Sequence, residues 1–457
     1  MTTTPLLPKR GPSVLLVSAV VLVGPLVPTS PAVFAAEPAV AAARALPLGA
    51  AGLTETRSTA TLQPGVTLTT VVRGAVDPRH VWTVEVNIPV GATSPDPDAP
   101  AAALSDRAGS DALAARLRAA GFEQRVEEVT TPATADYRGG RLGWRVRRLT
   151  IDPRTFSGTL QASYGPDLEA RETVSALSRA TGATAAVNAG YFVLDPAAGA
   201  PGDPAGVGVY DGRLLSETVG RRPAVVLRDD ARRTRVARLR WSGSVTAAGT
   251  SPLTLDGIDR VPGLVRNCGG LGDSPTTAPL HDFTGTDADE LVAFAPQYSS
   301  ATPAGAGLEA VLDRQSRVVS LRSPRGGPLL AGYRSVQATG ARVAELEQVA
   351  TVGARLRIRT SLRAGGQVLA RTDGLSVVNG GPALVRDGRL HVTPQRDGFV
   401  RPTNPSSYYG FSAERNPRTF AGVDARGRTL LATVDGRSTK SLGLSIVETA
   451  RVAKALA

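Results

Sequence analysis

The acidic side chain best placed for chemistry in this sequence is Asp435. It follows the apolar run LLATV and leads into the polar loop RSTKSLG instead of a returning strand. Functional groups are often carried on loops at strand ends, so the position suits a catalytic carboxylate, although a plain turn explains the same pattern. Two other Asp-Gly-Arg triplets, at Asp211 and Asp387, lie between apolar runs, where Asp-Gly predicts a hairpin turn.

Amides and an arginine occupy similar corners. Asn188 begins Asn-Ala-Gly after an apolar run, and Asn379 begins Asn-Gly-Gly-Pro after another. Each could present its amide to a sugar hydroxyl, or could simply make a tight turn. Arg418 starts a predicted strand that runs towards Asp424, and its guanidinium could bind a phosphate through two parallel hydrogen bonds. A surface pair between arginine and aspartate is the alternative for this last position.

Several kinds of chemistry have no residues to support them. Histidine occurs only at His80, His281 and His391, and the HExxH pattern of zinc enzymes is absent. Cys268 is the single cysteine, so the chain offers neither a cysteine cluster for zinc nor an internal disulfide. No P-loop and no dinucleotide fingerprint occurs. We therefore expect no metal site and can name no cofactor, which leaves the carboxylate, amide and arginine chemistry used on sugars and phosphodiesters.

Charge and length limit the partners. The formal net charge of +12 is nearly all arginine, because lysine occurs only at Lys9, Lys440 and Lys454. A positive surface could favour anionic wall polymers, acidic lipids or nucleic acid. The arginines form no long basic run and aromatic residues make up only 4%, so we do not expect nucleic acid as a partner. A chain of 457 residues can bury its own core and should divide into two or more units.

The N-terminus predicts export. Lys9 and Arg10 precede an apolar run from Val14 to Val23, and Val-Phe-Ala ending at Ala35 offers a small-residue cleavage site. We predict a signal peptide at 1–35 and a secreted or extracellular protein, with cell-wall association left open. A retained membrane anchor is the weaker reading, since the run is shorter than the roughly 20 residues a span needs. No stable membrane span is expected after cleavage.

The pattern of elements predicts an α+β fold that is rich in mostly antiparallel strands, with a few helices. Residues 36–60 are alanine-rich and read as a linker. Residues 61–146 predict a small αβ subdomain, with an amphipathic helix over 105–120 between two strands, which weakly resembles one half of a sporulation-related (SPOR) repeat, a peptidoglycan-binding module. From 147 to 457, short strands alternate with turn residues, and helices are expected over 168–180 and at the end of the chain.

Six segments in order closely resemble the phosphodiester glycosidase family, which includes the lysosomal uncovering enzyme and exported bacterial proteins linked to exopolysaccharide. The resemblance covers roughly 149–457. Its segments are AAVNAGYF from Ala185, GDPAGVGVYDGRLLSE from Gly202, DELVAFAPQY from Asp289, VVNGGPALVRDGR from Val377, NPRTFAGVDARGR from Asn416 and LLATVDGRS from Leu430.

The resemblance implies hydrolysis of a sugar-1-phosphodiester in a glycan or wall polymer. Such a reaction needs carboxylates or amides near the anomeric carbon and cationic or N–H donors for the phosphate. On this basis the catalytic candidates are Asp435 and Asp424. The candidate substrate-binding residues are Arg418 as the phosphate clamp, Asn188, Asp203 and Asn379 as sugar-orienting groups, and Gly380, Gly381 and Arg437.

Two departures from the family pattern bear on activity. Asn188-Ala189-Gly190 stands where the family usually has Asn-Gly-Gly. The terminal helix, capped by Ser445 with Glu448, normally leads to a strand and an Asp-Gly-Gly-Gly-Ser loop. We therefore expect an incomplete domain of uncertain competence, in which the apolar face of 446–456 packs poorly and Asp435 lies in a cleft with one open wall.

A non-catalytic protein that binds the cell wall or a polysaccharide, involved in exopolysaccharide biosynthesis, is the alternative function. The SPOR-like unit and the basic surface would carry that role, with peptidoglycan as the partner.

Overall fold

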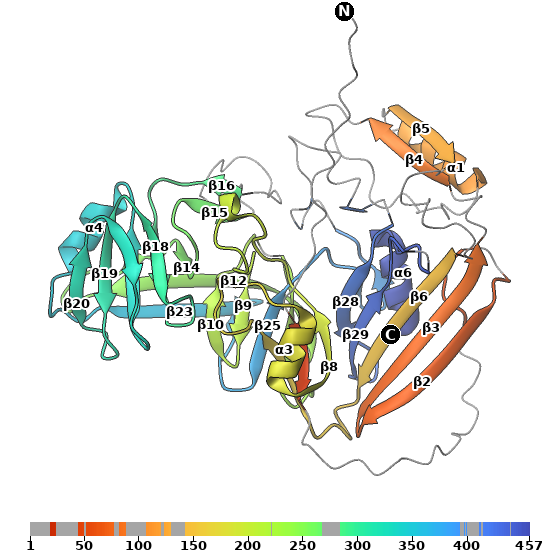
Figure 1. The fold of residues 1–457 in the computed structure, drawn as a ribbon, viewed down its shortest axis with the longest axis horizontal. Coiled ribbons are helices and arrows are strands. Elements are labelled where there is room, and N and C mark those ends of the chain that lie inside the picture. Colours follow the sequence, from red (N-terminus) through yellow and green to blue (C-terminus); the bar gives the residue numbers. More distant parts are fainter. Residues whose placement is uncertain are drawn as a thin grey trace, which may run out of the picture.

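The described residues form three larger sheets and several small ones (Figure 1). The computed structural model describes residues 19–23, 44–49, 52–76, 82–87, 107–119, 123–128, 142–220, 222–266, 284–393, 397, 399, 411–412, 415–438 and 440–457. Strand pairs in the larger sheets are antiparallel, except for the parallel pair of β14 (Gly257–Ile258) with β17 (Leu291–Phe294). The predicted fold class, α+β and rich in antiparallel strands, is confirmed.

The first sheet joins the two ends of the chain. Its order is β2 (Glu55–Gln63), β3 (Val66–Val76), β6 (Leu142–Ile151), β29 (Thr429–Val434) and β28 (Arg418–Val423). β29 pairs with β6 in a register that runs from Thr429 opposite Ile151 to Val434 opposite Val146. This pairing attaches the hairpin of β28 and β29, from near the C-terminus, to three strands from the first third of the chain.

The two faces of this sheet are buried against different layers. Successive side chains of a strand point to opposite faces. Trp144 and Val146 of β6 belong to the cluster that packs on the terminal helix α6 (Ile446–Leu456), whereas Leu149 and Ile151 belong to the cluster beneath β7 (Thr159–Ser163) and β8 (Ala183–Asn188). The odd-numbered residues of β6 therefore face β8, and the even-numbered ones face α6.

The terminal helix packs well, which corrects the expectation that its apolar face would lie open. Ile446, Val447, Ala450, Val452 and Leu456 are all buried. Val452 and Leu456 join Trp144, Val71 and Leu444 in one cluster. The predicted capping box is confirmed, since Ser445 Oγ accepts from the Glu448 N–H and Glu448 accepts in turn from the Ser445 N–H. Sequence reasoning missed this packing because it depends on a sheet assembled from distant segments.

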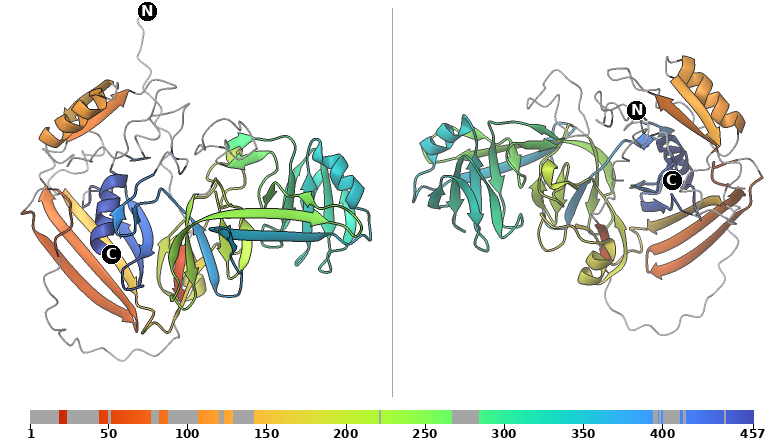
Figure 2. Two further views of the ribbon diagram at one scale, coloured as in Figure 1. Left: turned by 180° about the vertical axis from the view of Figure 1, so that it is seen from behind. Right: turned by 45° about the horizontal axis from the view of Figure 1, so that its top comes forward.

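The second and third sheets share a core. The second sheet has the order β10 (Arg213–Ser216), β9 (Gly208–Tyr210), β25 (Leu375–Asn379), β11 (Pro223–Arg228), β12 (Arg235–Thr246), β23 (Arg357–Ala364) and β24 (Gln367–Val368), with β13 (Leu253–Thr254) on β12. The third has the order β14, β17, β22 (Arg334–Ala338), β19 (Leu308–Leu312) and β20 (Val318–Arg322), covered by α4 (Arg342–Val349). One apolar cluster runs through both sheets, and the long pair β12 and β23 connects them (Figure 2).

Smaller units complete the described chain. In the three-stranded sheet β7-β1-β8, β1 is Ala19–Val23. Helix α3 (Val174–Thr181) packs against β1 and β8 of this sheet. Two-stranded sheets pair β15 (Leu264–Arg266) with β16 (Thr284–Thr286), β18 (Ala301–Gly305) with β21 (Arg325–Pro328), and β26 (Val385–Arg386) with β27 (Arg389–Leu390). A short 3-10 turn, η2, spans Pro196–Ala198. None of the described helices is both long and apolar enough to cross a membrane.

The N-terminal third is divided differently from the expected ranges. β2 starts at Glu55, inside the expected linker, and β3 pairs with β6 across the expected boundary between residues 146 and 147. The expected αβ unit is the smaller piece β4 (Trp82–Asn87), α1 (Arg107–Ala119) and β5 (Glu123–Glu128), whose strands pair with each other. The helix expected over 168–180 is shorter and forms α3.

The two hairpin predictions are confirmed. Asp211 and Asp387 have φ of 49°, each is followed by a glycine of positive φ, and each turn connects an antiparallel pair, β9 with β10 and β26 with β27. In the described residues that follow Asp435, no strand returns to pair with β29, so Asp435 stands apart from the other two Asp-Gly-Arg triplets.

The buried contact of α6 predicts the effect of Ile446→Ala. Ile446 is 5% exposed, and truncating a buried isoleucine typically lowers the free energy of unfolding by about 2–5 kcal/mol. Urea denaturation measures this change. Lys454→Ala, on the exposed side of the same helix, serves as the control and should change stability by less than about 0.5 kcal/mol. Equal effects of both substitutions would contradict the packing described for α6.

Candidate functional site

The polar residues that converge lie at one edge of the first sheet, where β8, β28 and β29 meet. β28 pairs with β29 so that Thr419 is opposite Thr433, and both are on the face that looks towards β8. Thr419 Oγ1 donates to Asn188 Oδ1, the last residue of β8, at 2.5 Å. This bond joins strands 231 positions apart in the sequence and brings the predicted Asn188 to the start of β28.

Asp435 is held on the same face by Arg147. Arg147 Nη1 donates to Asp435 Oδ1 at 2.7 Å, and the two side chains are 38% and 35% exposed. The Asp435 N–H donates to the Arg145 carbonyl at 3.1 Å, and its own carbonyl accepts from Ser441 Oγ. The carboxylate is therefore fixed in position, has a cation beside it, and remains within reach of solvent.

The corner after Asp435 is closely packed against the chain before β28. A Cβ on Gly436 would lie 2.5 Å from the Pro417 nitrogen and 2.9 Å from the Gly443 Cα, so only glycine fits there. Arg437 has φ of 51°, a rare conformation for a residue with a side chain, and its Nη2 donates to Asn416 Oδ1. In this structure Arg437 therefore fastens the corner to Asn416.

Asn379 pins the loop that follows Asn188. Its Oδ1 accepts from the Tyr191 N–H at 2.7 Å and its Nδ2 donates to the Tyr191 carbonyl at 3.2 Å. The Tyr191 hydroxyl donates to the Gly381 carbonyl at 2.7 Å. Gly190, with φ of 74°, passes so close that a Cβ would lie 3.3 Å from Val378 Cγ1. The Asn-Ala-Gly and Asn-Gly-Gly corners, with Gly380 between Asn379 and Gly381, are thus fastened to each other.

An aromatic strip extends from this loop towards β28. The Tyr191 and Phe399 rings lie 5.4 Å apart, and Phe399 stacks on Phe411 at 5.0 Å. The Arg222 guanidinium lies 4.4 Å from the centre of the Phe399 ring, and that of Arg418 lies 5.1 Å from the centre of the Phe411 ring. Phe399 is itself buried, so the strip is part of the packing next to Tyr191.

Arg418, predicted to clamp a phosphate, belongs to the opposite face of the sheet. It stands next to Thr419 on β28 and so points the other way, with Phe420 of the same parity packed in the cluster around α6. Its Nε donates to the Leu444 carbonyl at 2.8 Å and its Nη2 to the Phe411 carbonyl at 2.5 Å. These contacts connect β28 to the chain before α6.

Asp424, the second predicted carboxylate, makes the turn at the far end of the hairpin. Its Oδ1 accepts from the N–H groups of Arg426 and Arg428 at 2.9 Å each, and its Oδ2 accepts from Arg428 Nε at 2.7 Å. Asp424 and Asp435 lie at opposite ends of the hairpin formed by β28 and β29. The structure does not bring these two carboxylates together.

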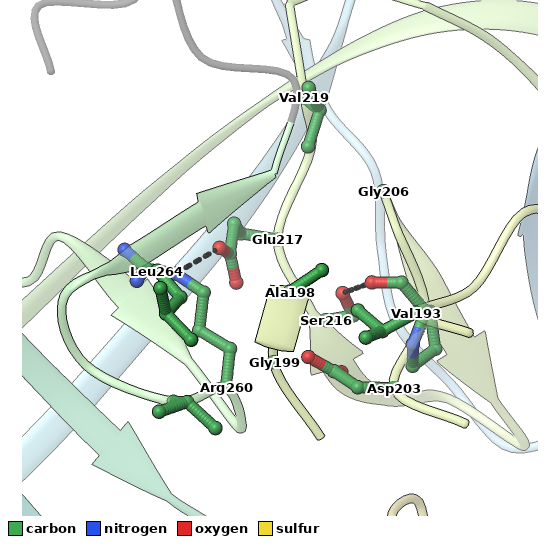
Figure 3. Close-up of a pocket in the computed structure, with 12 residues that line it drawn as sticks. Val193, Ala198, Gly199, Asp203, Gly206, Ser216, Glu217, Val219, Arg260 and Leu264 are labelled. Atoms are coloured by element: carbon green, nitrogen blue, oxygen red, sulfur yellow. Dashed lines mark hydrogen bonds and ion pairs between the residues drawn. The ribbon is translucent and has the colours of Figure 1, made fainter. Parts of the chain in front are cut away.

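Asp203 lies elsewhere again, in a small hollow next to the corner loops (Figure 3). Gly206, Ser216, Glu217 and Arg260 also line it. Arg260 is held by Glu217 at 2.8 Å and by Glu290, and the Ser216 hydroxyl donates to the Pro204 carbonyl. The open space is about 10 Å³, room for about one water molecule, so this hollow does not hold a sugar ring.

A buried acid lies next to this hollow. Asp259 is 1% exposed, and burial raises its pKa to about 8, with the nearby Glu217 charge adding to the rise. The bond that its Oδ1 accepts from the Ala295 N–H acts in the opposite direction. Among the residues that the structure describes, no group of three His, Cys, Asp or Glu side chains could hold a metal ion.

Sequence reasoning missed Arg147 and Thr419 as members of this site. Thr419 stands in the Asn-Pro-Arg-Thr segment next to the arginine that was chosen. Arg147 belongs to no recognisable sequence motif. The signal that could have indicated its orientation is its position two residues before the buried Leu149, which places both on the same face of the strand. Neither could be selected without the register of β6, β29 and β28.

The chain resembles known proteins in sequence and in fold. The phosphodiester glycosidase family model matches residues 307–456. A solved structure named "Putative exported protein", from Burkholderia pseudomallei K96243, is 31% identical, with 92% of each chain covered and a TM-score of 0.72. Residues 307–456 belong to the phosphodiester glycosidase family. A hypothetical protein from Synechocystis, 15% identical over 88% of this chain and 68% of that one, shares the fold with a TM-score of 0.52. No curated protein matches the chain.

The part matched by the phosphodiester glycosidase model supplies most of the converging residues. It contains Asn379, Thr419 and Asp435, while Asn188 and Arg147 come from the chain before it. The site is therefore assembled between the matched segment and strands β6 and β8.

Asn379→Ala should loosen the loop after Asn188. The substitution removes both hydrogen bonds to the Tyr191 backbone and should lower the free energy of unfolding by about 1–3 kcal/mol, which urea denaturation can measure. Gln367→Ala, an exposed amide in β24, is the control and should leave stability nearly unchanged. The described role of Asn379 fails if both variants unfold at the same urea concentration.

Asp259→Asn should change the dependence of stability on pH. The native pKa of about 8 lies above the unfolded value of about 3.9, so below pH 4 both states are protonated and no penalty applies. As pH rises from about 4 to 8, unfolding releases a proton and wild-type stability falls relative to the variant. Thermal unfolding of both proteins across this range measures the difference, and a constant difference would contradict the raised pKa.

Proposed function

We propose that this protein hydrolyses a sugar-1-phosphodiester in a glycan or wall polymer, with the site where β8, β28 and β29 meet. The observation that carries the proposal is the pair Arg147 and Asp435, held beside the Thr419 to Asn188 contact. The match of residues 307–456 to the phosphodiester glycosidase family supports this class of substrate.

The chemistry requires a cation for the phosphate and a carboxylate for the sugar. Water attacks the anomeric carbon as the bond from that carbon to the phosphate oxygen breaks. A proton of the water passes to the departing phosphate, so the products are the free sugar and a phosphate monoester. The Asp435 carboxylate faces the positive charge that develops on the sugar ring, and the Arg147 guanidinium donates to the phosphate oxygens. Because phosphate is a good leaving group, this scheme needs no strong general acid.

Asn188 and the pinned loop would orient the sugar. Asn188 accepts a hydrogen bond from Thr419 of β28. Asn379 holds the loop after Asn188 in place by accepting a hydrogen bond from the Tyr191 N–H. Positioning a substrate by rigid supporting groups contributes to rate because less orientational freedom is lost in the transition state. In this scheme Asn379 acts as a positioning residue, and Arg418 and Arg437 hold the framework around Asp435.

Export belongs to the proposal as well. The charged and apolar N-terminal segment has the form of a signal peptide, and a relative of this chain is named as an exported protein. The proposed substrate is a glycan outside the cell, with exopolysaccharide or wall polymers as the two candidates.

Asp435→Asn tests the proposed reaction. We expect release of sugar from a glycosyl-1-phosphodiester to fall at least about 100-fold, because the neutral amide cannot stabilise the positive transition state. Asp424→Asn is the matched control, since it removes a carboxylate of the same hairpin that lies at the distant turn. Sugar release can be followed by chromatography. Equal loss in both variants, or no difference between Asp435→Asn and wild type, would refute the assignment.

Peptidoglycan binding is a second candidate, supported by the unit β4-α1-β5. Its two strands pair with each other along Trp82 to Asn87, and its helix contacts both. The resemblance of its sequence to a SPOR repeat is what suggests peptidoglycan as the ligand. Replacing residues 82–128 by a Gly/Ser linker should abolish retention of the full chain on purified peptidoglycan while leaving sugar release intact. Undiminished retention would remove this role.

A further inference from the structure

β7, α3 and β8 form a β-α-β unit in which one strand position separates β7 from β8, and β1 occupies that position. β1 pairs antiparallel with β7, from Ala19 opposite Ser163 to Val23 opposite Thr159. On its other side β1 pairs antiparallel with β8, from Ala19 opposite Asn188 to Val23 opposite Ala183. β7 and β8 are therefore parallel to each other and are separated by the width of one strand.

The separation means that β7 and β8 cannot bond to each other directly. Neighbouring strands lie about 4.8 Å apart, so two strands with a third between them are about 10 Å apart. Without the middle strand, each would present unpaired N–H and C=O groups along its inner edge, beneath α3. The topology of this unit thus builds a slot for one extended segment, antiparallel to both of its neighbours.

The segment in the slot suits a buried strand. Ala19, Val20, Val21, Leu22 and Val23 form an unbroken apolar run, as is typical of strands covered on both faces. The same run belongs to the predicted signal peptide, which cleavage after Ala35 would remove. One segment therefore has two incompatible fates, as part of the sheet or as a leader that is cut away.

We propose that the position between β7 and β8 is a strand-acceptor site, filled by Ala19–Val23 before N-terminal processing and open to another extended segment once β1 has been removed. Ala19 pairs with Asn188, and Asn188 accepts the hydrogen bond from Thr419. N-terminal processing that removes β1 vacates the slot and frees the end of β8. The ligand class is an extended apolar peptide of about five residues, bound mainly through its main chain as in other cases of strand addition.

Proline substitution in the full-length chain tests the proposal. Val21→Pro removes an N–H from the middle of β1, which a strand paired on both sides cannot tolerate. Leu15→Pro is the matched control in the same apolar run, outside β1. Hydrogen exchange followed by mass spectrometry measures protection of residues 159–163 and 183–188. We expect exchange there to accelerate at least tenfold in Val21→Pro and to stay unchanged in Leu15→Pro.

A synthetic peptide of residues 17–24 provides the second measurement. Added to the full-length Val21→Pro protein, it should restore protection of β7 and β8 saturably, while the same peptide carrying Val21→Pro should not. Equal protection in wild type and Val21→Pro, or failure of the peptide to restore lost protection, would overturn the proposal. Because the readout is hydrogen exchange, its failure is distinguishable from failure of the proposed hydrolysis.

Discussion

The antiparallel pairing of β6 with β29 is the constraint on which the rest of the structure depends. It joins residues 288 positions apart when it brings Arg147 to Asp435. The same pairing gives α6 a sheet to pack on, since Trp144 and Val146 of β6 and Val434 of β29 lie beneath that helix. A change that broke this pairing would remove both the charged pair of the site and the cover of the terminal helix.

The alternation of side chains along these strands decides which residues share the site. Thr419, Thr433, Arg147 and Asp435 occupy the face towards β8, while Arg418 and Val434 occupy the face towards α6. Arg418, in the recognisable segment, therefore stabilises the framework. Arg147, which belongs to no motif, pairs with the Asp435 carboxylate. A family pattern locates the strands, and the parity of each position within the sheet assigns its role.

Local signals allowed much of the fold to be predicted, because each depends on neighbouring residues. The capping box of Ser445, the hairpins at Asp211 and Asp387, and the strand Thr429–Val434 are of this kind. The burial of α6, the membership of β3 in the first sheet and the separation of Asp424 from Asp435 depend on long-range register, which no local pattern contains. The apolar run Ala19–Val23 satisfies the requirements of both a leader and a buried strand, so its sequence cannot distinguish them.

The central claim is that the sugar phosphate binds where β8, β28 and β29 meet. A crystal structure with a non-hydrolysable sugar-1-phosphonate ester tests it most directly. We expect the phosphonate oxygens to lie against the Arg147 guanidinium and the sugar ring to lie between Asn188 and Asp435. Binding of the analogue at another place, such as the hollow lined by Asp203 and Arg260, would contradict the account.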